Sequence, residues 1–337
     1  MSNTNADVII IGAGICGLMA AEKLAKSGAQ VLVLEREPVV GGRLATIDLG
    51  AGCGDTGAQF FTAHLPEFQH IVDHWIEAGL VFEWATGFSD GSLVLLPTLS
   101  DYPRYAVSGG MRALPEYLAS QIKDVRVNNA VISTAYAEKK WQVQTGDGAT
   151  FTARVLLLTL PVPLALPLLT EGATDLAELD FDTLSAITYA PCLTGIFRLD
   201  GAAHLPQGGI QRHNSNLIWI GDNHQKGISP RAYILTAQAG GQYSAQMWET
   251  PEERVLQAMS AQLQPFLAGQ ATIQEARLIR WRYARPITTH RARCMTAAGG
   301  IPLVLAGDAF NGPRVEGAVL SGLAAANAIQ ALLKTGA

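Results

Sequence analysis

The hydrophobic pattern at the start of the chain predicts a strand, a helix and a second strand, in that order. An apolar run at 7–11, DVIII, leads into GAGICG, and QVLVLE at 30–35 predicts a second strand that ends at Glu35. Between them, LMAAEKLAKSG has helical periodicity, and Gly28 is placed to end the helix. The apolar residues expected on the buried face of this helix are Leu18, Ala21, Leu24 and Ala25. This order of elements is typical of nucleotide-binding α/β folds.

The middle of the chain carries a second apolar pattern. Residues 125–161 predict a strand, a hairpin and a strand, with Gly146-Asp147-Gly148 as the hairpin signal. Residues 155–169, VLLLTLPVPLALPLL, predict a buried strand followed by an irregular segment, because three prolines interrupt the stretch. The stretch is shorter than the roughly 20 residues that a spanning helix needs. A monotopic membrane foot remains an alternative for it.

Two further segments have clear patterns. Residues 301–310, IPLVLAGDAF, predict an apolar strand that ends at Gly307-Asp308, and a helix follows that begins near Arg314. Residues 64–75, HLPEFQHIVDHW, predict a helix with His70 and His74 facing solvent, so we expect no metal site there.

Composition narrows the class of protein. The chain has 337 residues, which favours two domains, and it is 48% hydrophobic and only 16% charged. The net charge is −5 and basic residues form no block, which excludes the charge pattern of a nucleic-acid binder. The four cysteines are widely spaced, and the N-terminal segment lacks the basic region of a signal peptide. We therefore expect a cytoplasmic protein without a disulfide framework or a zinc site.

The glycines after the first strand have the spacing of a dinucleotide-binding turn. Gly12 allows the tight turn, Gly14 lets a phosphate approach the backbone, and Gly17 lets the helix pack closely. The helix dipole then faces the pyrophosphate. Glu35, at the end of the second strand, is placed to bind both hydroxyls of an adenosine ribose and would repel a 2′-phosphate. These features predict an adenine dinucleotide site.

Residues 41–43 indicate which dinucleotide is bound. Gly41-Gly42-Arg43 is similar to the GG-R element of flavoproteins such as the monoamine oxidase and hydroxybenzoate hydroxylase-like families, in which an arginine can pair with phosphate. Asp308 is expected to accept hydrogen bonds from ribityl hydroxyls, and the helix near Arg314 to stabilise negative charge on a reduced flavin. A nicotinamide-dependent dehydrogenase would leave these features without a role. FAD is therefore the expected cofactor.

The expected fold is α/β with two domains: a Rossmann-type FAD-binding domain and a substrate domain built on an antiparallel sheet, as in p-hydroxybenzoate hydroxylase-like proteins. The FAD-binding domain is expected to be discontinuous, with residues 1–78, 107–162 and 298–337. Residues 79–106 and 163–297 are expected to form the substrate domain.

Five stretches together resemble the renalase family, most closely its bacterial branch. They are Gly41-Gly42-Arg43, GAQFFTA at 57–63, LTLPVP at 158–163, RWRYARP at 280–286 and GDAFNGPRVEGAVLSG at 307–322. The resemblance extends over nearly the whole chain. It implies oxidation of the 2- and 6-dihydro isomers of NAD(P)H to NAD(P)⁺ by noncovalently bound FAD, with O₂ reduced to H₂O₂. A small-molecule substrate is then expected, with no nucleic-acid partner.

The motifs and the resemblance together assign site residues. Gln59 and Phe61 are expected beside the isoalloxazine, with Gln59 offering its amide to the ring edge or to substrate, and Trp281 is expected to pack in the sheet. The residues expected to act on substrate are Gln59, Tyr283, Arg285 and Asn311. The residues expected to bind FAD are Gly12, Gly14, Ile15, Cys16, Gly17, Glu35, Arg36, Gly42, Arg43, Gly57, Ala58, Gln59, Phe60, Val131, Gly307, Asp308, Arg314, Val315, Glu316, Gly317 and Ala318.

The sequence lacks the residues of other catalytic mechanisms. Hydride transfer to a flavin needs alignment and exclusion of water but no nucleophile or strong base, and no Ser/His/Asp set or carboxylate pair is apparent in the sequence.

Two other functions fit part of the pattern. An amine oxidase or a desaturase for an apolar substrate is the first alternative, although no lysine lies in the stretches assigned to the flavin. A noncatalytic flavin-binding scaffold is the second, and it would not need Tyr283, Arg285 and Asn311.

Overall fold

The structure, a computed structural model, describes residues 4–91, 102–172, 174 and 176–335, and it divides into two compact units. The first unit contains Met1–Gly42, Pro115–Thr188 and Pro286–Ala337, and the second contains Arg43–Leu114 and Tyr189–Arg285. The division differs from the predicted domains. Residues 43–78 and 107–114 belong with the second unit, and residues 163–188 and 286–297 with the first. Part of the segment predicted at 79–106, residues 92–101, lies outside the described residues.

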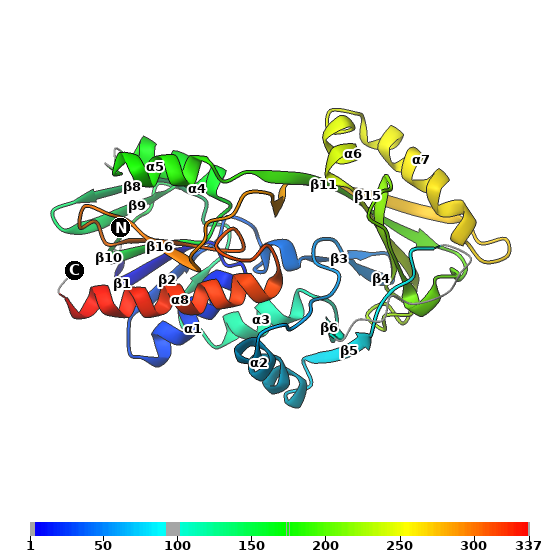
Figure 1. The fold of residues 1–337 in the computed structure, drawn as a ribbon, viewed down its shortest axis with the longest axis horizontal. Helices are drawn as coiled ribbons and strands as arrows, with labels where there is room; N and C mark the ends of the chain where they lie inside the picture. The colour runs from blue at the N-terminus through cyan, green and yellow to red at the C-terminus, as the bar shows by residue number, and fades with distance from the viewer. Residues whose placement is uncertain (1–3, 92–101, 173, 175, 336–337) are drawn as a thin grey trace. The chain divides into compact units, whose positions relative to one another are not determined.

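The first unit is built on an eight-stranded sheet (Figure 1). Its strands are β1 (Thr4–Ile11), β2 (Val31–Leu34), β7 (Val125–Arg126), β8 (Val131–Ala137), β9 (Lys140–Thr145), β10 (Thr150–Leu158), β16 (Cys294–Thr296) and β17 (Leu303–Ala306). The order is β16-β17-β10-β1-β2-β7, with β9 also paired to β10 and β8 paired to β9. Strands β17, β10, β1, β2 and β7 are parallel. Their near-continuous apolar sequences are typical of strands covered on both faces.

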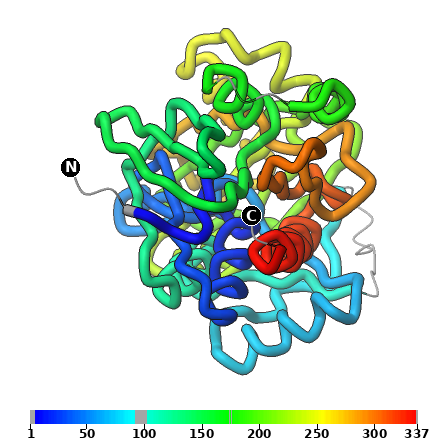
Figure 2. The backbone as a smooth tube through the Cα atoms, turned by 90° about the vertical axis from the view of Figure 1, so that its left-hand side faces the viewer, coloured from blue at the N-terminus to red at the C-terminus, as the bar shows by residue number. Residues whose placement is uncertain are grey.

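Two helices of this unit pack tightly against each other. They are α1 (Ile15–Lys26) and α8 (Val315–Lys334), and Figure 2 shows α8, in red, beside the blue α1. A Cβ on Gly322 would lie 2.2 Å from the carbonyl oxygen of Cys16, so the packing requires glycine there. On α1, Leu18, Ala21 and Leu24 are buried as predicted, whereas Ala25 is exposed. Helix α8 is long and apolar enough to cross a membrane, but half of its most apolar window is buried in the protein.

The segment after β10 corrects a prediction. Residues predicted to be irregular form the helix α4 (Val162–Glu171), with Pro161 as its N-cap residue and Pro167 within it. A proline in the first helical turn removes no intrahelical hydrogen bond, which is why Pro163 is tolerated. The predicted hairpin at Gly146-Asp147-Gly148 is confirmed by the antiparallel pairing of β9 with β10. A second hairpin, between β8 and β9, turns at Glu138-Lys139, whose φ angles of 53° and 60° are rare for residues other than glycine.

The first unit also contains α5 (Glu178–Ser185), and α3 (Ala113–Ser120) begins in the second unit and ends in the first. The predicted helix over 64–75 is observed as α2 (Pro66–Glu77) in the second unit, and His70 and His74 are exposed on it, as predicted.

The second unit is built on a five-stranded sheet of order β12-β13-β14-β11-β15. These strands are β11 (Tyr189–Leu199), β12 (Gly209–Gln211), β13 (Leu217–Asp222), β14 (Tyr233–Ala239) and β15 (Ile273–Pro286). The unit also contains two separate two-stranded antiparallel sheets. One pairs β3 (Thr46–Leu49) with β4 (Gly52–Asp55), and the other pairs β5 (Val81–Ala85) with β6 (Arg104–Val107). The remaining helices are α6 (Gly241–Gln246) and α7 (Glu252–Leu263).

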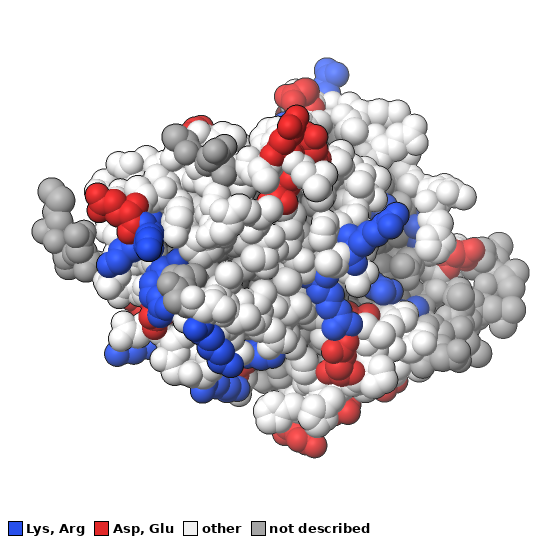
Figure 3. All heavy atoms as spheres, turned by 60° about the vertical axis from the view of Figure 1, so that its left-hand side comes forward, with Lys and Arg blue, Asp and Glu red and all other residues white. Residues whose placement is uncertain are grey.

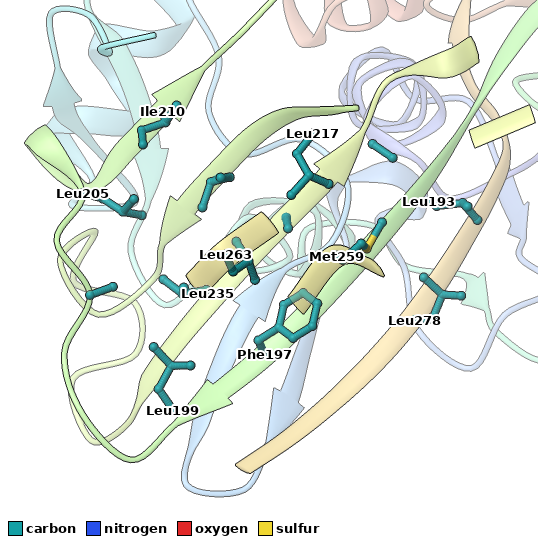
Figure 4. Packing of buried hydrophobic residues seen from close by; sticks show 14 of the residues in the cluster. Leu193, Phe197, Leu199, Leu205, Ile210, Leu217, Leu235, Met259, Leu263 and Leu278 are labelled. Carbon is teal, nitrogen blue, oxygen red and sulfur yellow. The ribbon is translucent and has the colours of Figure 1, made fainter. Parts of the chain in front are cut away.

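Helix α7 closes the core of this sheet. Figure 4 shows Phe197 of β11 and Leu235 of β14 beside Met259 and Leu263 of α7, all almost completely buried. The fold is therefore mixed α/β, with a Rossmann-type domain and a further sheet domain, as predicted. Charged side chains are scattered over the face shown in Figure 3 and separated by broad uncharged areas, as expected for 16% charged residues.

Candidate functional site

The turn after β1 has the geometry of a phosphate-binding turn. Gly12 has a φ of +105°, which favours glycine, and a Cβ on Gly17 would lie 2.1 Å from the carbonyl oxygen of Gly12. A Cβ on Gly14, by contrast, would have no neighbour within 4 Å among the described residues. Gly14 is the N-cap residue of α1, and no side chain caps this helix. The N-terminus of α1 therefore offers backbone N–H groups and open space to an anion.

The second glycine pair lies against this turn. Gly41 donates its N–H to the carbonyl of Ala13 at 2.9 Å and forms a bridge with Gly14. Gly41 and Gly42 have φ angles of +115° and +53°, which explains the two glycines. The GG pair thus completes the turn predicted to hold the pyrophosphate.

Glu35 joins three parts of the predicted adenosine site. Its side chain is buried, with Oε2 accepting the N–H of Ala13 at 2.8 Å and Oε1 accepting the N–H of Glu37 at 3.0 Å. The carbonyl of Glu35 accepts the N–H of Asn129 at 2.8 Å, which brings the segment before Val131 beside it. Each carboxylate oxygen keeps a second lone pair, so the ribose assignment is compatible with these bonds. Arg36 points to solvent and pairs with Glu37.

The Gly307-Asp308 turn is held from behind by a serine that the sequence analysis did not identify. The N–H of Gly307 donates to Ser321 Oγ at 2.8 Å, and that hydroxyl donates to the carbonyl of Arg293 at 2.5 Å. Asp308 follows β17 directly and is half-buried. A serine at this point of α8 carries no sequence signal of its own, because serine in a helix more often bonds within that helix.

Helix α8 begins beside this turn, as predicted. Arg314 is its N-cap residue and no side chain caps the helix, so the N–H groups of its first turn resemble those of α1. A Cβ on Gly317 would lie 2.1 Å from the carbonyl oxygen of Gly312, which explains that glycine. Glu316 is buried, with Oε2 3.7 Å from an Arg314 nitrogen, and Val315 and Ala318 occupy the same first turn.

In the second unit, the segment Asp55–Phe60, called the 55–60 turn below, directs its carbonyl groups into the protein. The carbonyl of Asp55 accepts Thr236 Oγ1 at 3.0 Å, and that of Gly57 accepts Gln238 Nε2 at 2.6 Å. The carbonyl of Thr56 accepts Trp281 Nε1 at 3.0 Å, which fixes Trp281 in the sheet as predicted. Side chains of β14 and β15 therefore hold this turn.

The side chain of Gln59 differs from its prediction. Its Nε2 donates to the carbonyls of Asp55 and Gly57 at 2.7 and 3.1 Å, and its Oε1 accepts Trp219 Nε1 at 3.2 Å. Gln59 is 6% exposed, and its amide bonds within its own unit because the carbonyls of the turn need donors.

The aromatic residues after Gln59 also separate into two environments. Phe61, predicted beside the isoalloxazine, is buried against Phe68, Trp75 and Tyr105, so it is a core residue of the second unit. Phe60 is half-buried, and its ring lies 5.3 Å from the ring of Trp219. The two neighbouring rings therefore pack against different partners.

A buried lysine contacts the turn. Lys226 donates from Nζ to the carboxylate of Asp55 and to the carbonyl of Gln59. No lysine lies in the stretches that the sequence assigns to the flavin, and Lys226 gives no local signal because 167 positions separate it from Gln59. Its local sequence, HQKGIS, is typical of an exposed loop.

Arg43 is partly committed to its own unit. Its Nη1 donates to the carbonyls of Tyr283 and Ala284 at 3.3 and 3.2 Å, and its own carbonyl accepts the N–H of Ala58 at 2.9 Å. A Cβ on Gly57 would lie 2.0 Å from that carbonyl, so glycine is required there. The role of Arg43 in phosphate binding stays a prediction.

The residues predicted to act on substrate lie on both units. On β15, Tyr283 is half-buried and packs edge-on to Tyr189 at 5.8 Å, and Arg285 is exposed. Arg282 lies over the ring of Trp248 at 4.9 Å. Asn311 belongs to the first unit, where its φ of +63° is a conformation that asparagine tolerates.

The two thiols of the second unit, Cys53 and Cys192, are partly buried. Burial raises the pKa of Cys192 to about 11, and burial also raises the pKa of Cys53, with Asp55 as the next cause. The four cysteines, which all lie in the described ranges, form no disulfide. Within the described ranges, no group of three His, Cys, Asp or Glu side chains could hold a metal ion.

The residues of the first unit fit a bound dinucleotide. The open space at Gly14, the uncapped N-termini of α1 and α8, and the buried carboxylate of Glu35 supply donors for phosphate and acceptors for ribose hydroxyls.

Comparison with known proteins supports a flavoprotein. The family described as flavin containing amine oxidoreductase matches residues 75–330, and an NAD(P)-binding Rossmann-like domain matches residues 10–75. The 1-hydroxycarotenoid 3,4-desaturase of Flavobacterium sp. (strain P99-3) is 48% identical over 65 residues, which are 19% of this chain and 12% of that protein. The putrescine oxidase of Kocuria rosea is 34% identical over 105 residues, which are 31% of this chain and 20% of that protein. The matches thus span a small part of these relatives.

Solved structures show the same fold over the whole chain. Cyclohexylamine oxidase from Brevibacterium oxydans IH-35A has a TM-score of 0.76 at 15% identity, covering 98% of this chain and 99% of that one. Wild-type putrescine oxidase bound to putrescine has a TM-score of 0.66 at 16% identity, covering 98% and 100%. The family match extends over most of the sequence, from the end of α2 to α8. The chain therefore belongs to the flavin-containing amine oxidoreductase family, and its cofactor is noncovalently bound FAD.

Proposed function

We propose that the protein is an FAD-dependent oxidase of the renalase type, which oxidises the 2- and 6-dihydro isomers of NAD(P)H to NAD(P)⁺. The observation that carries this proposal is the RWRYARP stretch on β15. Trp281 anchors it to the carbonyl of Thr56 at 3.0 Å, and Tyr283 and Arg285 follow at alternate positions of the same strand. An aromatic hydroxyl and a guanidinium on one strand face suit a dihydropyridine carboxamide and a phosphate.

The reaction balances without a strong base. Each turnover takes a hydride from the dihydropyridine ring and one proton from water, and reduces one O₂ to H₂O₂. FAD supplies the hydride acceptor and the route of the electrons to oxygen. Tyr283 would orient the ring, Arg285 would pair with the carboxamide or a phosphate, and Asn311 would contribute an amide. Alignment is the main demand on these residues, because no proton leaves the reacting carbon.

An amine oxidase or desaturase is the second candidate. It is favoured by the family match at residues 75–330 and by the similarity to putrescine oxidase and to carotenoid desaturases. Lys226 is bonded to Asp55 and to the carbonyl of Gln59. Because its ammonium group already has these two acceptors, Lys226 adds no support to the amine oxidase candidate.

Anaerobic stopped-flow absorbance near the flavin band separates the candidates. The FAD-loaded protein is mixed with 2-dihydroNAD, 6-dihydroNAD, ordinary NADH, putrescine and cyclohexylamine, each in a separate run. Rapid bleaching by the two isomers, with none by NADH or the amines, is the expected result. Bleaching by an amine alone would transfer the protein to the second candidate, and failure of every compound would contradict both.

A further inference from the structure

We propose that Lys226 is a positioning residue that fixes the backbone N–H of Phe60 as a hydrogen-bond donor to the bound ligand. This inference rests on the proposed function, because it takes FAD or its dinucleotide substrate as the ligand of the 55–60 turn. The side chains of Lys226 and Asp55 are 1% and 0% exposed, so the ion pair is completely inside the second unit.

The loop that carries Lys226 is rigidly attached. The N–H of Lys226 donates to the carbonyl of Asp222 at 2.9 Å, and Asn223 Nδ2 donates to Thr236 Oγ1 at 2.9 Å. The ring of Trp84 lies 5.0 Å from Nζ, a distance at which an aromatic face attracts a cation. The ammonium group is therefore held from several directions.

Asp55 is fixed just as firmly. Its Oδ1 accepts the hydroxyl of Thr46 at 2.5 Å and the N–H of Met111 at 2.8 Å, and its Oδ2 accepts Lys226. Removing one partner of a buried ion pair leaves an uncompensated charge, which is strongly unfavourable. The pair therefore holds the ammonium group at the carbonyl of Gln59.

Peptide geometry carries the effect to the other side of the turn. The C=O and N–H groups of a trans peptide point in opposite directions. Because Lys226 holds the carbonyl of Gln59 toward the interior, the N–H of Phe60 points away from Lys226. In the same way, Trp281 and Gln238 donate to the carbonyl of Thr56 and hold it toward the interior. The N–H of Gly57, in the same peptide, therefore points away from them.

The N–H groups of this turn differ in whether they are used. Thr56 donates to the carbonyl of Ala45 and Ala58 donates to that of Arg43, both at 2.9 Å. For Gly57, Gln59 and Phe60, no acceptor occurs in the part of the chain that the structure describes. Of these three, the N–H groups of Gly57 and Phe60 belong to peptides whose carbonyls, those of Thr56 and Gln59, are held toward the interior. Two donors directed away from the interior suit an electron-rich oxygen, such as a ring carbonyl or a carboxamide. The backbone of the turn, and not the side chain of Gln59, is then the ligand-binding element.

The test compares hydrogen exchange of residues 55–61 in the protein with and without FAD. The variants are Lys226→Met and the double variant Lys226→Met/Asp55→Asn, which avoids an unpaired buried charge if the single variant does not fold. The control is Arg198→Met/Glu275→Gln, which removes an ion pair of the same unit that is about one-third exposed. Exchange is read separately at 12–17 to confirm that FAD is bound.

In the wild type and the control, FAD or FAD with NAD⁺ should slow exchange of residues 57–61 about tenfold, as expected for a ligand hydrogen bond worth roughly 1.4 kcal/mol. In the Lys226 variants this protection should largely disappear, while protection at 12–17 remains. The flavin reduction rate should fall about tenfold with little change in KM, since alignment and not binding is lost. Unchanged protection at 57–61 in the double variant would overturn the inference.

Failure of the proposed function would look different. If dihydroNAD isomers do not bleach the flavin but FAD protects residues 57–61 only when Lys226 is present, the substrate is wrong and the positioning role stands. If the isomers bleach wild type and the double variant equally and protection is unchanged, the positioning role fails alone.

Discussion

The carboxylate of Glu35 accepts the backbone N–H of Ala13 at 2.8 Å, so the end of β2 is bonded directly to the glycine-rich turn that follows β1. The other oxygen accepts the N–H of Glu37 at 3.0 Å. One side chain thus shapes the phosphate turn and presents the remaining lone pairs to a ribose.

Replacing Glu35 with Gln should weaken FAD binding. The amide keeps the size of the side chain but retains only one acceptor oxygen, so one buried N–H loses its partner at a cost of about 1–3 kcal/mol. We expect the FAD dissociation constant to rise about 10- to 100-fold in a fluorescence titration. Glu37→Gln, at an exposed side chain, is the control and should bind normally. Equal affinity in both variants would contradict the role of Glu35.

Alanine at two glycines of the same turn should impair different properties, FAD binding in one case and stability in the other. A Cβ on Gly14 enters open space, so Gly14→Ala should fold with an unchanged Tm in the absence of FAD but bind FAD less tightly. A Cβ on Gly17 lies 2.1 Å from the carbonyl oxygen of Gly12, so Gly17→Ala should lower the Tm itself. Thermal unfolding with and without FAD separates the two. A Gly14→Ala protein with normal FAD affinity would argue against phosphate at this position.

Arg43→Met should reduce both stability and FAD occupancy. Loss of the bonds to the carbonyls of Tyr283 and Ala284 should cost about 1–3 kcal/mol, measured by urea unfolding. If Arg43 also binds FAD phosphate, the purified protein should carry less flavin absorbance. Arg277→Met is the matched control, because Arg277 is an exposed arginine on β15, the strand that carries Tyr283 and Ala284. Full FAD occupancy in Arg43→Met would leave Arg43 with a structural role only.

Two residues of β15 should affect reduction but not cofactor binding. Tyr283→Phe and Arg285→Ala are each expected to slow anaerobic flavin reduction by a dihydroNAD isomer about tenfold, equivalent to roughly 1.4 kcal/mol of transition-state alignment. Arg282→Ala is the control, because Arg282 stacks on Trp248. Reduction at the wild-type rate in both test variants would remove these residues from the site.

Cys192 should react slowly with alkylating reagents. Burial raises its pKa to about 11 from an ordinary value of 9.0, so less of the thiol is ionised at pH 8. The thiolate is the reactive form, and its population should be about one-hundredth of that of an unperturbed thiol. Peptide mass spectrometry after timed iodoacetamide treatment should show slow labelling in the folded protein and rapid labelling after denaturation. A rate in the folded protein equal to that of a free thiol would contradict the raised pKa of Cys192.

Much of the first unit could be read from the sequence, because its signals are local. The glycine spacing at 12–17, the acidic end of β2 and the Gly307-Asp308 turn lie where the sequence places them. The strand pattern of β10 was also correct. The helix α4 was not predicted, because three prolines suggested an irregular segment. Pro161 and Pro163 lie at the start of the helix, where proline is tolerated, and only Pro167 lies within it.

Family membership rests on the match over residues 75–330, whereas the expected cofactor followed from local patterns. The sequence by itself determined the class of cofactor, because phosphate and ribose recognition depends on short segments whose backbone geometry requires glycine or a terminal carboxylate. The tertiary structure alone decided what surrounds the 55–60 turn. Gln59 turns inward, Phe61 joins a core, and Lys226 pairs with Asp55 from 171 positions away. These outcomes depend on which distant donors meet the carbonyls of the turn, and folding brings such groups together without leaving a periodic signal in the sequence.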